Sequence, residues 1–247
     1  MKQTDYPLGL HHVTAMTSDV EKNYRFFTEI LGTRLGKKTV NQDDIQTYHT
    51  YYADDKGTPG TTMTFFDFPG NPQGIKGTNS VTRTSFRVPN ERALDYYLTR
   101  FAEFKIKHEA ITEVFGKKVL RFWDFDNQAY QLISDENNHG MAPGTPWQKG
   151  PVPVDYAIYG LGPVEITVSY FADFLAVFEK VFQFKVVAKE GDYVLLEVGK
   201  GGNGAQVILI KDTKQAVGQQ GYGEVHHIAF RLAQAESLKV WETLLNV

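Results

Sequence analysis

The sequence predicts an α+β fold built from tandem βαβββ modules. Three observations support this prediction: four strand-like openings of similar length recur along the chain, each is followed by an amphipathic helix pattern, and in the first three copies three further strand-like runs follow the helix. Such internal repetition is typical of chains made from similar structural units. It favours tandem modules over an α+β domain whose repeats arise by chance.

The first module covers about residues 8–70. Its opening strand is predicted by the alternating run Leu10–Met16. Ser18 and Glu21 have the spacing of a helix capping box. The apolar residues that recur at helical intervals after this point are Val20, Tyr24, Phe27 and Leu31. Strand-like runs then return at about 35–40, 48–53 and 62–68.

The second module covers about residues 80–135, the third about 160–212, and the fourth begins at about 223. Their predicted opening strands are Val81–Val88, Gly162–Val168 and Glu224–Leu232. Asn90 is placed to cap the second helix, and the third helix is predicted over Phe171–Phe182. The predicted strands after the second helix are Ile106–Thr112, Lys118–Asp124 and Ala129–Ser134. The predicted fourth helix carries Leu238, Trp241, Leu244 and Leu245.

Residues 137–155 are rich in proline and glycine and read as a linker or a long crossing loop. They divide an N-terminal half, 1–136, from a C-terminal half, 156–247. The fourth module supplies no strands after its helix before Val247, so we expect it to be incomplete in this chain. Because unfinished sheets leave open edges, the chain alone is expected to be unstable or to associate into a homo-oligomer.

Composition excludes several classes of protein. The 247 residues carry 26 Lys+Arg and 29 Asp+Glu, with 42% hydrophobic residues, which is ordinary for a globular protein. The small negative charge gives no reason to expect nucleic acid or an anionic membrane as partner. No cysteine is present, which excludes thiol catalysis and Cys-ligated metal sites and fits a cytoplasmic location. No signal peptide or transmembrane segment is recognisable.

Two doubled histidines occupy the same place in modules one and four: His11-His12 and His226-His227. Neighbouring residues on a strand point to opposite faces, so each pair is expected to send one imidazole each way. His12 shares its face with Thr14, and His227 with Ala229, which suits the lining of a solvated cavity. These second histidines are therefore the better candidates for metal ligands, whereas hydrogen-bonded histidines without a metal are the plain alternative.

The corresponding positions in the other modules hold Arg83 and Glu165, so modules two and three are interpreted as scaffold. Two histidines need a carboxylate to complete the facial triad typical of non-haem iron(II). The place of this carboxylate in module two is taken by Gln131, about 48 residues after Arg83. The same spacing after His227 reaches about position 275, beyond Val247.

At these residues the chain resembles the vicinal-oxygen-chelate superfamily, which includes glyoxalase I, bleomycin- and fosfomycin-resistance proteins and extradiol dioxygenases. It looks closest to hydroquinone-type ring-cleaving dioxygenases and their bacillary relatives in quinone-stress operons. The Asp124–Leu132 segment resembles the ending of the family's metal-binding modules. The other matching motifs are Leu10–Thr14, Lys37–Asn41, Thr47–Asp54, Gly57–Phe66 and His226-His227.

The resemblance implies a non-haem Fe(II) ring-cleaving dioxygenase that takes O₂ and a hydroquinone or catechol, with Mn, Zn or Ni as alternative metals. It assigns His12 and His227 as metal ligands, with a glutamate beyond Val247 as the third. His11, Thr14 and His226 match pocket residues around the metal. Aromatic residues of the strands at 48–52 and 65–68 are expected either to line this pocket or to belong to the core.

Two other functions stay open at this point. A glyoxalase-like metal-dependent lyase has the same fold but usually uses two carboxylates, which the doubled histidines and Gln131 disfavour. A metal-free protein of the bleomycin-resistance kind would bind an aromatic compound without cleaving it. The absence of the expected carboxylate before Val247 supports this second alternative.

Overall fold

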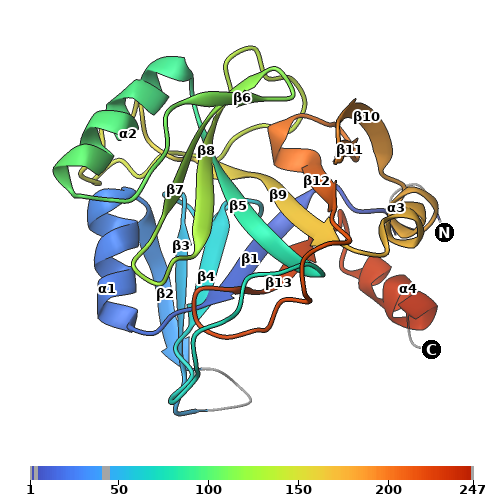
Figure 1. The fold of residues 1–247 in the computed structure, drawn as a ribbon. Coiled ribbons are helices and arrows are strands. Elements are labelled where there is room, and N and C mark those ends of the chain that lie inside the picture. Colours follow the sequence, from blue (N-terminus) through green and yellow to red (C-terminus); the bar gives the residue numbers. More distant parts are fainter. Residues whose placement is uncertain (1, 3–4, 41–44, 246–247) are drawn as a thin grey trace.

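The computed structural model describes residues 2, 5–40 and 45–245, and it confirms the α+β fold (Figure 1). The first module consists of β1 (Leu10–Met16), α1 (Val20–Arg25) continued by a π-helical turn (Phe26–Ile30), β2 (Arg34–Val40), β3 (Tyr48–Ala53) and β4 (Thr62–Phe66). The second consists of β5 (Ser80–Val88), α2 (Glu91–Glu103), β6 (Thr112–Val114), β7 (Lys117–Trp123) and β8 (Ala129–Ser134).

The third module consists of β9 (Gly160–Val168), α3 (Phe171–Lys180), β10 (Lys185–Glu190), β11 (Tyr193–Glu197), a 3₁₀ turn (Asn203–Ala205) and β12 (Gln206–Lys211). The fourth opening is β13 (Val225–Phe230), followed by α4 (Glu236–Leu245). The predicted order of strand, helix and three strands is therefore observed three times. The division of the chain into two halves at the linker stays a prediction.

Hydrogen bonding between strands joins modules that are far apart in the sequence. One sheet has the order β13-β1-β4-β3-β2, and the other has the order β10-β11-β12-β9-β5-β8-β7-β6. The first strand of each complete module runs parallel to its last strand, as the module pattern requires. Modules one and four thus share one sheet through β1 and β13, and modules two and three share the other through β5 and β9.

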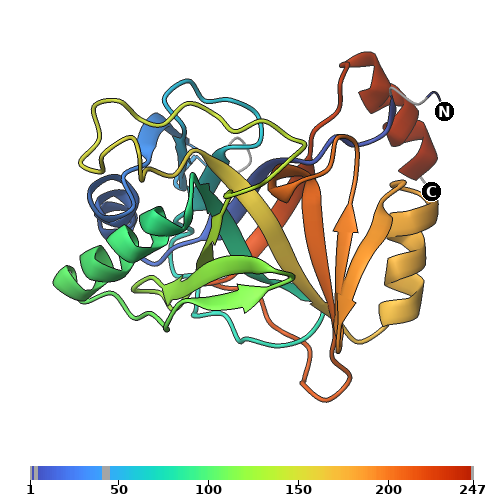
Figure 2. The ribbon, with the colours of Figure 1, turned by 90° about the horizontal axis from the view of Figure 1, so that it is seen from above.

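The helices lie at the two sides of the molecule with the sheets between them: α1 and α2 on one side, α3 and α4 on the other (Figures 1 and 2). Phe27 lies at the centre of the core on the first side. Its ring packs 4.7 Å from the ring of Tyr52, 4.9 Å from Phe65 and 6.0 Å from Tyr130, measured between centroids. It therefore connects the α1 turn to both sheets, and all four side chains are buried.

Local structure differs from the sequence prediction at the first helix. Asp19 caps α1 by accepting hydrogen bonds from the backbone N–H groups of Glu21 and Lys22. Ser18 instead donates to Asp126 in the turn after β7. The π-helical turn buries both Phe26 and Phe27, while Tyr24 is exposed. The prediction that Ser18 caps this helix was wrong, because a tertiary partner takes its hydroxyl group.

Two further elements differ from prediction. Within Ile106–Thr112, the residues before Thr112 lie outside the named strands, apart from one isolated bridge between His108 and Phe122, and β6 begins at Thr112. On α4 only Trp241 of the expected apolar residues is buried, where its indole N–H donates to the Asp5 carbonyl 2.6 Å away. Leu238, Leu244 and Leu245 are exposed.

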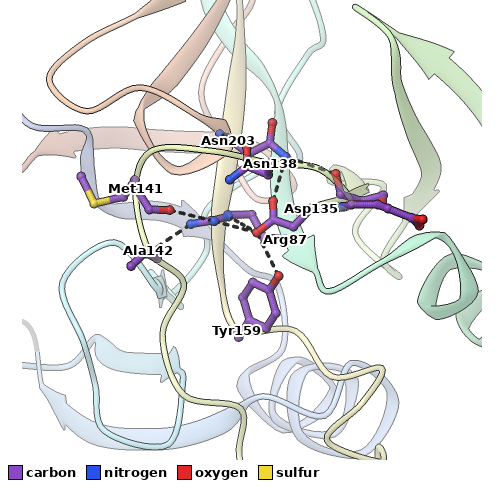
Figure 3. A network of polar contacts seen from close by, with 9 residues as sticks. Arg87, Asp135, Asn138, Met141, Ala142, Tyr159 and Asn203 are labelled. Carbon is purple, nitrogen blue, oxygen red and sulfur yellow. Dashed lines mark hydrogen bonds and ion pairs between the residues drawn. The ribbon is translucent and has the colours of Figure 1, made fainter.

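A buried ion pair fastens the Pro/Gly-rich segment to the eight-stranded sheet (Figure 3). Arg87 on β5 lies 2.6 Å from the Asp135 carboxylate, and its guanidinium also donates to the Met141 carbonyl at 3.0 Å. Asp135 accepts further hydrogen bonds from the Tyr159 hydroxyl, 2.9 Å away, and the Asn203 amide, 2.8 Å away. Removing the carboxylate would leave a buried cation without its counter-ion.

We therefore expect Asp135→Ala to lower the free energy of unfolding by about 3–5 kcal/mol, the cost of an unpaired buried charge. Urea denaturation followed by circular dichroism measures this change. Glu113→Ala is the matched control, because Glu113 pairs with Lys118 in an exposed bridge that contributes at most about 1 kcal/mol. Equal effects of the two substitutions would contradict the assigned role of the pair.

The turn between β7 and β8 is organised around a buried carboxyl group. One oxygen of Asp124 accepts hydrogen bonds from the N–H groups of Asp126 and Gln128, both 2.9 Å away, and the other accepts from the Tyr130 hydroxyl at 3.0 Å. Burial, and then the neighbouring Asp126 carboxylate, raise the pKa of Asp124 to about 7. The folded protein therefore holds a proton here that the unfolded chain releases at lower pH.

Because folding raises this pKa, the protonated Asp124 stabilises the folded state at low pH. This contribution to the free energy of unfolding is lost as the pH rises to about 7. We expect Asp124→Asn, which keeps the acceptor for both N–H groups, to become more stable relative to the unsubstituted protein as the pH rises from 4 to 7. The expected slope is on the order of 1 kcal/mol per pH unit. Urea titrations across this pH range measure the difference in free energy of unfolding between Asp124→Asn and the unsubstituted protein. A difference that stays constant or falls as the pH rises would count against a neutral Asp124.

Candidate active site

The antiparallel pair β1–β13 brings the second histidines of the two doublets together. The register places Thr14 opposite His227 and His12 opposite Ala229. The Nε2 atoms of His12 and His227 lie 3.2 Å apart, although 215 residues separate them in the sequence. Two imidazole nitrogens from neighbouring strands therefore point at one place.

The first histidines lie beside the second ones, not on the opposite face. The β1–β13 register skips His11 on one strand and His226 on the other, so each is the extra residue of a β-bulge. The Nδ1 atoms of His11 and His12 are 3.0 Å apart, and those of His226 and His227 are 2.8 Å apart. The expectation that His11 and His226 point away from the site was wrong, because strict alternation fails at a bulge.

A chain of polar side chains runs from this place across the neighbouring strands. Thr14 Oγ1 lies 3.0 Å from His227 Nε2 and 2.8 Å from Thr64 Oγ1 on β4. Thr64 in turn contacts His49 Nε2 at 3.0 Å, and His49 Nδ1 contacts the Tyr51 hydroxyl at 2.8 Å. Sequence reasoning found Thr14 but gave His49 no partner. The sequence does place His49 and Tyr51 on one face of the same strand. Only the order of the strands in the sheet shows that this face points toward Thr64 and the other histidines.

The aromatic residues of β3 and β4 divide between the core and the site. Tyr52 and Phe65 pack on Phe27 in the core. Phe66 contacts the other face: its ring lies 4.2 Å from the ring of His49 and 5.6 Å from that of His226. The core interpretation therefore holds for Tyr52 and Phe65, and the expectation that aromatic residues of this run line the pocket stays a prediction.

Burial and neighbouring charged groups lower the pKa values of four histidines of the site, His11, His12, His49 and His227. Burial first, then the neighbouring His227, lowers the pKa of both His12 and His49 to about 4. Burial also lowers the pKa of His11, with Arg231 adding to the effect, and that of His227, with His226 adding to it. Neutral imidazole is the form that binds transition metals.

A pocket of about 330 Å³ opens beside the histidines, between β13 and the third module. Its lining includes His226, His227, Val81, Ile166 and Phe174. This volume lies at the lower end of the range for small-molecule sites, which suits a ligand the size of one aromatic ring.

The donor set fits a divalent transition metal. Nitrogen ligands bind such ions at about 2.0–2.1 Å, so two nitrogens 3.2 Å apart are able to bind one ion together. Across residues 2, 5–40 and 45–245 no cluster of three or more His, Asp or Glu side chains forms a metal site. The predicted glutamate ligand near position 275 lies outside the described residues and stays a prediction.

A family model described as the glyoxalase/bleomycin resistance protein/dioxygenase superfamily matches residues 9–139. The chain is 37% identical over 243 residues to MhqA of Bacillus subtilis, which is named as a candidate ring-cleaving dioxygenase; the match covers 96% of this chain and 76% of MhqA. The chain belongs to this superfamily. It also shares 26% identity over 232 residues with a chlorohydroquinone/hydroquinone 1,2-dioxygenase of Sphingobium indicum, covering 92% of this chain and 71% of that protein.

A solved structure of a candidate dioxygenase from Bacillus subtilis superposes with a TM-score of 0.87 at 31% identity, covering 98% of this chain and 75% of that one. These superfamily relatives support a dioxygenase role for the chain. Members of the superfamily and its extradiol-type dioxygenases are generally metal-dependent, which agrees with the converging imidazoles. Among the described residues, the helices are all too short or too polar to span a bilayer.

The site makes a spectroscopic prediction. In metal-free protein, His12 and His49 are expected to titrate at about pH 4, since burial and nearby imidazoles disfavour their charged forms. Two-dimensional ¹H–¹⁵N NMR of the imidazole nitrogens between pH 3.5 and 8 measures these midpoints. Assignment by His12→Gln and His49→Gln identifies the signals, and midpoints at or above 6.5 would refute the description of the site.

Proposed function

We propose that this protein is a non-haem Fe(II)-dependent ring-cleaving dioxygenase that acts on a hydroquinone or a catechol with O₂. The observation that carries the proposal is the approach of His12 Nε2 and His227 Nε2 to 3.2 Å on the strand pair shared by modules one and four. The relatives named as ring-cleaving dioxygenases support the reaction class, and the Sphingobium relative's printed name supports a hydroquinone-type substrate.

His12 and His227 would hold the metal through their Nε2 atoms, with a glutamate near position 275 as the third ligand. Iron(II) would supply open positions for O₂ and a phenolic oxygen, and it lowers the pKa of a bound phenol. Mn, Zn and Ni are the alternative ions for the same donors.

His11 and His226 would orient the two ligands. Each lies with its Nδ1 within hydrogen-bonding distance of the ligand's own Nδ1, so one proton is shared in each pair. When the proton resides on the ligand's Nδ1, its Nε2 is left with a free lone pair directed at the metal. The outer histidine is then the acceptor and keeps its Nε2–H toward the solvent-facing side.

The same outer histidines are suited to hold the oxygen of a bound phenolate. Both are exposed at the site, and in the tautomer described above each carries its proton on Nε2, where it is able to donate a hydrogen bond to that oxygen. Phe174, which lines the pocket beside His226 and His227, offers an aromatic surface against which a flat substrate would pack.

Metal titration tests the donor set directly. Anaerobic Fe(II) binding, followed by calorimetry, is expected to weaken by about 100-fold or more in His12→Ala and His227→Ala, and by about 10-fold or more in His11→Ala and His226→Ala. His108→Ala is the matched control, because its ring contacts the Ile106 carbonyl and no residue of the site.

Oxygen uptake with hydroquinone or catechol, followed by mass spectrometry of the product, tests the reaction. Incorporation of both atoms of ¹⁸O₂ into an opened ring is the expected result. Saturable hydroquinone binding by metal-free protein, with no ring opening when iron is bound, would instead favour the aromatic-binding function. Cytoplasmic location and self-association stay predictions of the sequence.

A further inference from the structure

The eight-stranded sheet contains a second concave site, at the position that corresponds to the histidines in the other sheet. There β5 and β9 pair antiparallel, as β1 and β13 do, and the register sets Arg83 opposite Glu165. Arg121 on β7 lies opposite Gln131 on β8. Gln131 occupies the position at which the module spacing places a metal ligand. Charged side chains thus occupy the part of the module that holds imidazoles in the first sheet.

These side chains form a cluster of two cations and one carboxylate. Arg83 Nε lies 3.2 Å from one oxygen of Glu165, and Arg121 Nη2 lies 3.8 Å from the other. Two guanidinium groups therefore share one carboxylate, which is 4% exposed. Arg121 Nε and Glu165 Oε1 are buried without a hydrogen-bond partner, and Arg121 does not line the neighbouring pocket. Arg83 does line it and is therefore the guanidinium that a ligand would reach.

Two other carboxylates lie near the cluster. Asp212 lines the pocket, where its oxygens accept hydrogen bonds from the backbone N–H groups of Lys214 and Gln215 and from the Gln215 amide. Glu109 is exposed on the segment before β6, and its negative charge attracts Arg83. The positive side of the cluster is further strengthened by Lys107, which makes no ion pair within the described residues.

An aromatic platform stands next to the cations. The Lys107 Nζ atom lies 4.6 Å from the centroid of the Trp123 ring, and Arg83 Cζ lies 5.3 Å from it. With Tyr193 on the opposite wall, these residues line a pocket of about 380 Å³. Apolar and aromatic walls with a few convergent polar groups are typical of small-molecule sites of this size.

We propose that this pocket is a second ligand site, which binds a small organic anion with its carboxylate toward Arg83 and Lys107 and its flat body against Trp123. Guanidinium groups bind carboxylates by paired hydrogen bonds that are strong where water is excluded. The site uses no histidine and no metal, so it is independent of the proposed dioxygenase reaction.

Isothermal titration of metal-free protein with benzoate tests the proposal, with neutral benzamide as the matched ligand. Benzoate is expected to bind at one site with a Kd of about 1 mM or tighter, and benzamide at least about tenfold more weakly. His12→Ala is expected to bind benzoate as the unsubstituted protein does, which separates this pocket from the histidine site.

Charge-removing variants locate the carboxylate. Arg83→Gln is expected to weaken benzoate binding about tenfold, and Lys107→Gln about threefold, since each loses a charged contact. Lys118→Gln removes a charge from β7 outside the pocket lining, where Lys118 pairs with exposed Glu113, and is expected to leave binding unchanged. Melting curves show whether Arg83→Gln is folded, and Lys107, an exposed residue, provides the test if it is not.

Four results would each overturn the proposal. They are the lack of saturable benzoate binding in the millimolar range, equal affinity for benzamide, loss of binding in His12→Ala, and full binding retained in both Arg83→Gln and Lys107→Gln.

Discussion

The antiparallel pairing of β1 with β13 is the contact on which the candidate active site depends. It joins the first module to the fourth and sets His12 Nε2 3.2 Å from His227 Nε2. Backbone hydrogen bonds fix the two strands far more tightly than side-chain contacts between distant loops would. Bulges at His11 and His226 then turn the outer histidines toward the inner ones, so four imidazoles gather where a regular ladder would have separated them.

The two sheets repeat one architecture with different chemistry at its centre. In the first sheet neutral imidazoles with lowered pKa values meet, and in the second the guanidinium groups of Arg83 and Arg121 share the carboxylate of Glu165. The corresponding strand pairs therefore carry imidazoles in one sheet and a charged cluster in the other, so the module is a scaffold for different sets of side chains.

Packing explains how such different centres coexist in one molecule. Phe27 contacts residues of both sheets, and Arg87 with Asp135 ties the Pro/Gly-rich segment to β5 and to the turn before β12. None of these contacts involves His12, His227, Arg83 or Glu165, so the packing of the core and the chemistry of the two sites rest on different side chains. The polar chain from Thr14 to Tyr51 is the part of the first site that reaches furthest across its sheet.

The sequence by itself determined the modules, because strand alternation, helical spacing and the Asn90 cap are local properties. It also pointed to His12 and His227, since the doublets recur at matched positions. Tertiary structure decided the rest: sheet order placed His49 next to Thr64, Asp126 took the hydroxyl of Ser18 from its expected cap, and bulges reversed the facing of His11 and His226. Each of these depends on how the strands pair and in what register. The Ser18–Asp126 contact and the β1–β13 pairing also join residues more than 100 positions apart, which leaves no local pattern in the chain.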